Sequence, residues 1–287
     1  MNRWLMIFVV LFMFACNNKQ VKTGDLPVIS TSVLPQKYFI EQIAGDMVKV
    51  NVLIPPGASP ATYEPTVSQL QDLKNSMVYM RIGYIAFELS WLDKIRSVNS
   101  EMTIIDLSEG VELIAEEAHH GDHHTGVDPH IWLSPKNAKI IGKNIFDALV
   151  NQMPEKREIL EKNYNAFLSK TDSLDKYITG ELETLEKRGF FCYHPSLSYY
   201  AKEYNLQQYP IELEGKAPSS AHLKYLTDLG KRENIQVIFL QMQFDQHNAK
   251  VLAKETGAEI IQINPLDLEW FDQMVYITDR LKSGTNE

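Results

Sequence analysis

The chain has 287 residues, of which 44% are hydrophobic and 23% are charged, a composition ordinary for a globular protein with a substantial core. Its formal net charge is −9, which argues against nucleic acid as a partner and is compatible with a cationic ligand. The sequence holds two cysteines, Cys16 and Cys192. Because Cys16 lies in a separate N-terminal segment, we expect the folded part to have no intrachain disulfide.

The N-terminal segment predicts export. Residues 4–14 are continuously apolar, about half of the ~20 residues needed to cross a bilayer, so residues 1–15 are predicted to be a signal peptide. A small residue directly before Cys16 is typical of bacterial lipoprotein cleavage sites, which predicts an acylated Cys16; the alternative is an ordinary signal peptide. Residues 16–26 are mostly polar and suit a tether. We expect a periplasmic or cell-surface protein anchored to a membrane.

The first half of the chain alternates short β-rich runs with amphipathic stretches. We predict strands at residues 29–34, 48–54, 77–80 and 103–107, and helices at 36–45 and 66–75. This alternation predicts a mostly parallel sheet covered by helices. The turn-rich segment 55–60 follows a predicted strand, where open α/β sheets place their ligands.

A long helix is predicted in the middle of the chain. Ser134 and a following proline begin one helix that continues to about residue 152. Pro154 restarts the helix, and apolar positions hold one face from there to Arg188, a length of about 50 Å. A helix this long extends beyond one small domain, so we expect it to connect two domains and to resist bending.

The second half repeats the α/β alternation. Predicted strands are 190–193, 236–240 and 259–263, and predicted helices are 198–204, 220–233 and 246–256. The predicted fold class is α/β, with two α/β lobes joined by one long rigid helix and a metal site in the interlobe cleft. The expected domains are an N-terminal lobe at 27–152 with a His-rich loop at 116–126, a connecting helix at 153–188, and a C-terminal lobe at 189–287.

Five of the eight histidines lie within residues 119–134. Neutral imidazole is the commonest protein ligand for zinc-like cations, so this cluster indicates metal binding. Four of these histidines form a polar loop: His119, His120, His123 and His124. The fifth, His130, stands in an Asp-Pro-His sequence. Two interpretations of this loop stay open: a flexible segment that collects zinc, and a disordered segment whose histidines are incidental.

His194 directly follows the predicted strand 190–193. A histidine there can face His130 across a cleft between lobes, and two histidines supply half of a tetrahedral zinc shell. The alternative for either residue is a buried, hydrogen-bonded structural histidine. His222 and His247 lie on predicted exposed helices and are expected at the surface.

Several motifs together resemble one family over residues 28–281: IAGDMVKVNVLIPPGASPATYEPT, WLDKI, DPHIWLSPKNA, FFCYHPSLSYYAKEYNL, KAPSSAHL and VIFLQMQFDQHNAKVLAKETGAEI. The sequence is similar to the solute-binding lipoproteins of bacterial zinc and manganese ABC importers. This resemblance implies two α/β lobes, a rigid connecting helix and one divalent cation between the lobes.

The resemblance also implies ligands. His130 and His194 match family histidines, whereas Ala61 stands where the family has its first histidine and Asn264 where it has a late aspartate. Asn264 and Asp267 are predicted to help complete the shell together with the two histidines. Further candidates are Gln241, Glu214 and a histidine of the loop.

The implied function is capture of Zn²⁺ outside the cytoplasmic membrane and its delivery to an ABC permease by a monomeric, lipid-anchored protein that is not an enzyme. His194 favours zinc over manganese because nitrogen ligands suit zinc better. Alternatives are a receptor for Mn²⁺ or a chelated metal, and a zinc hydrolase. A hydrolase needs three protein ligands and a poised base, and no His-Glu-x-x-His motif is present.

Overall fold

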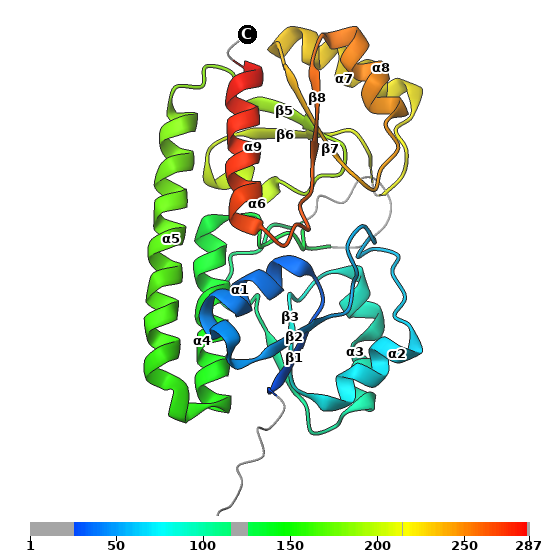
Figure 1. Ribbon diagram of the computed structural model, residues 1–287. Helices are drawn as coiled ribbons and strands as arrows, with labels where there is room; N and C mark the ends of the chain where they lie inside the picture. The colour runs from blue at the N-terminus through cyan, green and yellow to red at the C-terminus, as the bar shows by residue number, and fades with distance from the viewer. Residues whose placement is uncertain (1–25, 116–125, 214, 286–287) are drawn as a thin grey trace, which may run out of the picture.

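The computed structural model describes residues 26–115, 126–213 and 215–285. The predicted signal peptide, Cys16, Glu214 and the four loop histidines lie outside the described residues. Figure 1 shows two lobes, one above the other, with helix α5 (Arg157–Glu183) running alongside both. Within the described part of the chain, no helix combines the length and the apolar character needed to cross a bilayer.

The N-terminal lobe is a parallel four-stranded sheet in the order β2-β1-β3-β4. Its strands are β1 (Val28–Thr31), β2 (Lys49–Val52), β3 (Ser76–Arg81) and β4 (Thr103–Asp106). Helices α1 (Leu34–Ala44) and α4 (Pro135–Gln152) cover one face, and α2 (Val67–Asp72) and α3 (Ala86–Val98) lie on the other side (Figure 1). Strand β1 ends earlier than predicted because α1 already begins at Leu34. Helix α3 was not predicted.

The C-terminal lobe has the same topology, with parallel strands in the order β6-β5-β7-β8. These are β5 (Gly189–Cys192), β6 (Gln207–Pro210), β7 (Val237–Gln241) and β8 (Glu259–Ile263). Helices α6 (Ser198–Glu203) and α9 (Trp270–Thr285) pack toward α5, whereas α7 (Ser220–Glu233) and α8 (His247–Thr256) cover the opposite face (Figure 1). Strand β6 and helix α9 were not predicted.

The connecting helix is shorter than predicted. A 3₁₀ turn at Pro154–Lys156 precedes α5, whose 27 residues span about 40 Å. The helix ends at Glu183, and Gly189 begins β5 instead of stopping the helix. Two further 3₁₀ turns follow α1 and α2, at Gly45–Met47 and Leu73–Asn75. Helix α5 still contacts α1 and α4 of the first lobe and α9 of the second, so it braces both lobes.

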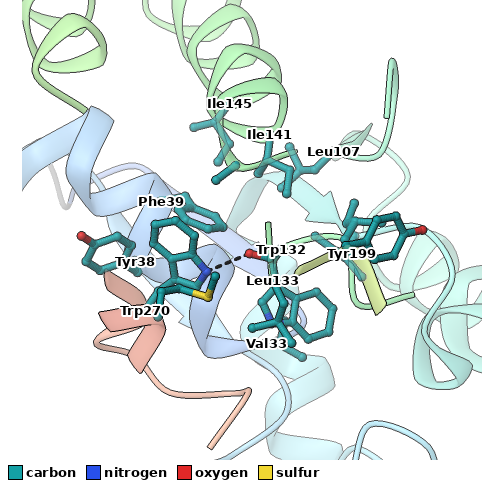
Figure 2. Packing of buried hydrophobic residues seen from close by; sticks show 14 of the residues in the cluster. Val33, Tyr38, Phe39, Leu107, Trp132, Leu133, Ile141, Ile145, Tyr199 and Trp270 are labelled. Atoms are coloured by element: carbon teal, nitrogen blue, oxygen red, sulfur yellow. Dashed lines mark hydrogen bonds between the residues drawn. The ribbon is translucent and has the colours of Figure 1, made fainter. Parts of the chain in front are cut away.

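One hydrophobic cluster runs without interruption from the first lobe into the second, and two buried tryptophans lie at the junction (Figure 2). The Trp132 indole N–H donates to the carbonyl of Pro265 at 2.8 Å, and the Trp270 indole N–H donates to the carbonyl of Trp132 at 2.8 Å. Phe39 of α1 packs edge-to-face on Trp270, with ring centroids 4.9 Å apart. These contacts fix the segment that carries His130 against the β8–α9 connection.

Candidate metal centre

His130 lies just before α4, outside the strands of the first sheet, and a buried carboxylate holds its ring. Asp128 Oδ1 is 2.8 Å from His130 Nδ1 and also accepts the main-chain N–H of His130 at 2.9 Å. The Tyr199 hydroxyl donates to the carbonyl of Asp128 at 2.8 Å. Burial alone would raise the pKa of Asp128, but the charge and hydrogen bonds of His130 lower that pKa below its usual value. A carboxylate at Nδ1 keeps the proton there and leaves the Nε2 lone pair free.

His194 has the same arrangement in the second lobe. It lies two residues beyond the end of β5, and Glu212 Oε1 is 2.5 Å from its Nδ1. The Glu212 residue is only 3% exposed, so its charge faces the imidazole more than water. The Phe244 ring stacks on the imidazole at 5.4 Å and 19°. Hydrogen bond and stacking together orient Nε2 of His194.

The two free nitrogens point at each other across the lobe junction. His130 Nε2 and His194 Nε2 are 3.3 Å apart, with the rings nearly perpendicular at 72°. Two Zn–N bonds of about 2.0–2.1 Å at a tetrahedral angle of about 109° separate the nitrogens by about 3.3 Å. At this distance one nitrogen can donate a proton to the other, and a cation bound between them would take the place of that hydrogen bond. The pair therefore has the chemistry and the spacing of two ligands on one zinc ion.

The carboxylates behind the two histidines, Asp128 and Glu212, were not predicted from the sequence. Asp128 stands two residues before His130, and the Asp-Pro-His spacing could have indicated it. Glu212 follows the unpredicted strand β6, and only tertiary structure brings it to His194. Imidazoles that bind metals usually donate their second N–H to such a carboxylate, which raises the basicity of the ligand nitrogen.

Asn264 and Asp267 lie in the β8–α9 connection and bond to each other. The Asn264 amide donates to Asp267 Oδ2 at 3.0 Å, and its oxygen accepts the N–H of Leu266 at 3.3 Å. Asp267 Oδ1 accepts the N–H of Glu269 at 3.0 Å. Asn264 also lines a cavity of about 20 Å³ together with the Pro55–Gly57 turn of the first lobe. These bonds shape the turn, and the assignment of both residues as ligands stays a prediction.

The remaining candidates are placed differently. Ala61 lies exposed in the loop after β2. Gln241 is buried, and its amide bonds to the main chain of His194, so this side chain has no free oxygen to offer a metal. The ends of the predicted histidine loop meet in a bridge between Ala115 and Val127, three residues before His130.

The other two histidines lie away from this pair. His247 is exposed at the start of α8, as expected. His222 is only half-buried, and its Nε2 lies 3.2 Å from the carbonyl of Pro210. Across residues 26–115, 126–213 and 215–285, no group of three or more His, Cys, Asp and Glu side chains is placed to hold a metal ion. In the described residues, the candidate site therefore rests on the pair His130 and His194.

The chain is similar to known proteins over most of its length. The chain is 33% identical to "Zinc-binding lipoprotein AdcA" of Streptococcus pneumoniae over 268 residues, 90% of this chain and 53% of AdcA. It is 31% identical to "High-affinity zinc uptake system protein ZnuA" of Bacillus subtilis, covering 93% of this chain and 89% of that protein. A crystal structure of ZnuA superposes with a TM-score of 0.86 at 35% identity, over 91% of this chain and all of the other. The chain spans about half the length of AdcA.

The fold is that of a two-lobed binding protein. It has two parallel α/β lobes of one topology, a long helix along both and a histidine pair at their junction. The family model "ZnuA: Zinc-uptake complex component A periplasmic" matches residues 29–284. The chain belongs to this family. Its members are binding components of transport systems and not enzymes, so the hydrolase alternative falls away.

Proposed function

We propose that this protein captures Zn²⁺ outside the cytoplasmic membrane and delivers it to the permease of an ABC importer. The observation that carries the proposal is the 3.3 Å separation of His130 Nε2 and His194 Nε2, each imidazole backed by a buried carboxylate. The zinc-uptake family to which the chain belongs supports the same cargo.

We further propose His130 and His194 as protein ligands of the zinc ion, with Asn264 and Asp267 as candidates to complete the shell. Nitrogen donors at two positions favour zinc over manganese, which prefers oxygen. The lobes are proposed to act as a monomer, tethered to a membrane by an acyl chain on Cys16. The relative named as a zinc-binding lipoprotein supports that anchor.

The proposal is tested by equilibrium dialysis of the purified protein against equal concentrations of Zn²⁺ and Mn²⁺, followed by elemental analysis. The expected result is retention of at least one zinc ion per chain and exclusion of manganese. Retention of manganese in preference to zinc would contradict the cargo assignment.

A further inference from the structure

A buried glutamine lies directly behind the main chain of His194. Gln241 is the last residue of β7 and is 1% exposed. Its Oε1 accepts the main-chain N–H of His194 at 3.1 Å, and its Nε2 donates to the carbonyl of the same residue at 2.7 Å. The Gln241 side chain therefore binds both the main-chain N–H and the main-chain carbonyl of His194.

The second donor of the amide is also used. Gln241 Nε2 lies 2.9 Å from Ser196 Oγ, so the amide also bonds to the turn that follows His194. In the described part of the chain, no other acceptor for the His194 N–H is found. Removing the amide would leave that N–H without a partner at the base of the His194 side chain. The His194 carbonyl would still accept from the Ser196 N–H and the Cys192 thiol, so we expect the ring to shift rather than the turn to unfold.

We propose that Gln241 is a positioning residue for zinc binding: it fixes the backbone of His194 so that Nε2 points at His130. This inference rests on the proposed role of His194 as a ligand. Glu212 and Phe244 set the rotation of the ring, whereas Gln241 sets the backbone from which the ring projects. The role uses both ends of the amide, because the oxygen accepts from the N–H while the nitrogen donates to the carbonyl.

The first lobe contains a matched control. Gln36 is fully buried, accepts the N–H groups of Ser32 and Val33 at 3.0 Å each, and donates to the carbonyl of Met80 at 2.9 Å. It ties the loop after β1 to β3, yet that loop carries no histidine. Loss of the Gln36 amide should therefore cost stability without moving His130 or His194.

The test compares Gln241→Met and Gln36→Met in the full chain, because methionine keeps a similar length without hydrogen-bonding capacity. Zinc affinity is measured by competition with a chelator of known affinity, and the ligand geometry by the visible spectrum with one equivalent of Co²⁺. We expect Gln241→Met to weaken zinc binding by about 10–100-fold, as changes behind a metal ligand do, and to alter the cobalt spectrum. Gln36→Met should lower the unfolding temperature but leave affinity within about twofold and the spectrum unchanged.

Parental affinity and spectrum in Gln241→Met, or an equal loss of affinity in Gln36→Met, would overturn the inference. If Gln241→Met does not fold, Gln241→Glu replaces it. A carboxylate keeps the acceptor for the His194 N–H but opposes its carbonyl, so an affinity below that of the parent is expected and parental affinity would refute the inference. His194→Ala is measured alongside: parental zinc affinity in that variant would overturn the proposed function itself, whereas a loss there with parental affinity in Gln241→Met would refute only the role of Gln241.

Discussion

The two lobes have the same sheet order, and each buries a glutamate near the loop that follows its first strand, but only in the second lobe does that glutamate hold a histidine. The histidine of the first lobe, His130, is held by Asp128 in the segment before α4. In the first lobe, Glu88 is fully buried and bonds to Ser32 and to the N–H groups of Ile82 and Gly83. In the second lobe, Glu212 bonds to His194. The Glu88 carboxylate ties loops to each other, whereas the Glu212 carboxylate holds an imidazole that we propose as a metal ligand.

The difference lies in the loop after the first strand of each sheet. In the first lobe this loop carries Ser32, whose hydroxyl also bonds to Tyr79 Oη at 2.6 Å. In the second lobe the corresponding loop carries His194. The first lobe has no ligand in that loop, and its histidine, His130, comes from the segment before α4 that the tryptophans tie to the second lobe. The loop after the first strand thus belongs to a structural network in the first lobe and carries a candidate metal ligand in the second.

The largest expected effect follows from removing either imidazole. His130→Ala and His194→Ala should each weaken zinc binding by more than about 100-fold, beyond the range expected for changes behind the ligands. Isothermal titration of both variants measures this, with His247→Ala as a control because His247 is exposed on α8. Parental affinity in both variants would remove the pair from the site.

Glu88 should make the free energy of unfolding depend on pH. Burial raises the pKa of Glu88 to about 7 from an ordinary 4.5, although its hydrogen bonds to Ser32, Ile82 and Gly83 oppose this. The folded chain therefore binds more protons than the unfolded chain between pH 4.5 and 7, and the free energy of unfolding falls as pH rises through that range. Glu88→Gln should remove this component, about 3 kcal/mol at most. Denaturant titrations of zinc-free protein across the range measure it, and identical pH slopes in parent and variant would contradict the assignment.

Neutralising the carboxylate behind His194 should weaken zinc binding by about 10–100-fold, because an amide at Nδ1 supports a less basic Nε2. The change is Glu212→Gln, and chelator competition measures it. The matched control is Glu88→Gln, which removes the equally buried carboxylate of the other lobe and should leave zinc affinity within about twofold. Equal effects of the two changes would mean that the lobes do not differ as described.

Introducing a histidine at position 61 of the first lobe tests the comparison in the opposite direction, because it adds a nitrogen ligand instead of removing one. Ala61→His is expected to tighten zinc binding by about tenfold, or about 1.4 kcal/mol, by adding a nitrogen at an exposed loop position where the family has one. The neighbouring exposed change Thr62→His serves as the control and should have no such effect. An unchanged affinity in Ala61→His would show that this loop does not reach the ion.

The smallest effect on affinity is expected from the histidine loop. Deleting residues 116–126 and joining Ala115 to Val127, which already pair in a bridge, should lower the number of zinc ions bound while keeping the tight site within a few-fold of its parental affinity. Titration to saturation gives both quantities. Damage to the tight site would instead mean that a loop histidine completes the shell in place of Ala61.

Much of the fold could be predicted because the buried strands and helices have clear periodicity. Helix α7 and strand β8 have the predicted bounds, and α4 ends where expected. Strand β6 was missed because QQYP has no β-branched residue and ends in proline. Helix α9 did carry a signal, since Trp270, Met274, Ile277 and Leu281 recur at helical spacing and are buried.

The candidate site could be predicted in part. The sequence indicated His130 and His194 because one lies in a histidine cluster and the other follows a strand. It did not indicate Glu212, and it indicated Gln241 only as a candidate metal ligand, since each reaches His194 only after the parallel strands β5, β6 and β7 have assembled. Unlike Asp128, which stands two residues before His130, these two residues contact His194 across the sheet, and no spacing in the sequence indicates them.

The most direct test of the account is the position of the ion in a crystal of the zinc-loaded protein, located by anomalous scattering at the zinc edge. The account predicts a peak within about 2.1 Å of both His130 Nε2 and His194 Nε2, with Asp128 and Glu212 bonded to the opposite nitrogens. A strongest peak bound to only one of the two imidazoles, or placed elsewhere in the molecule, would contradict it.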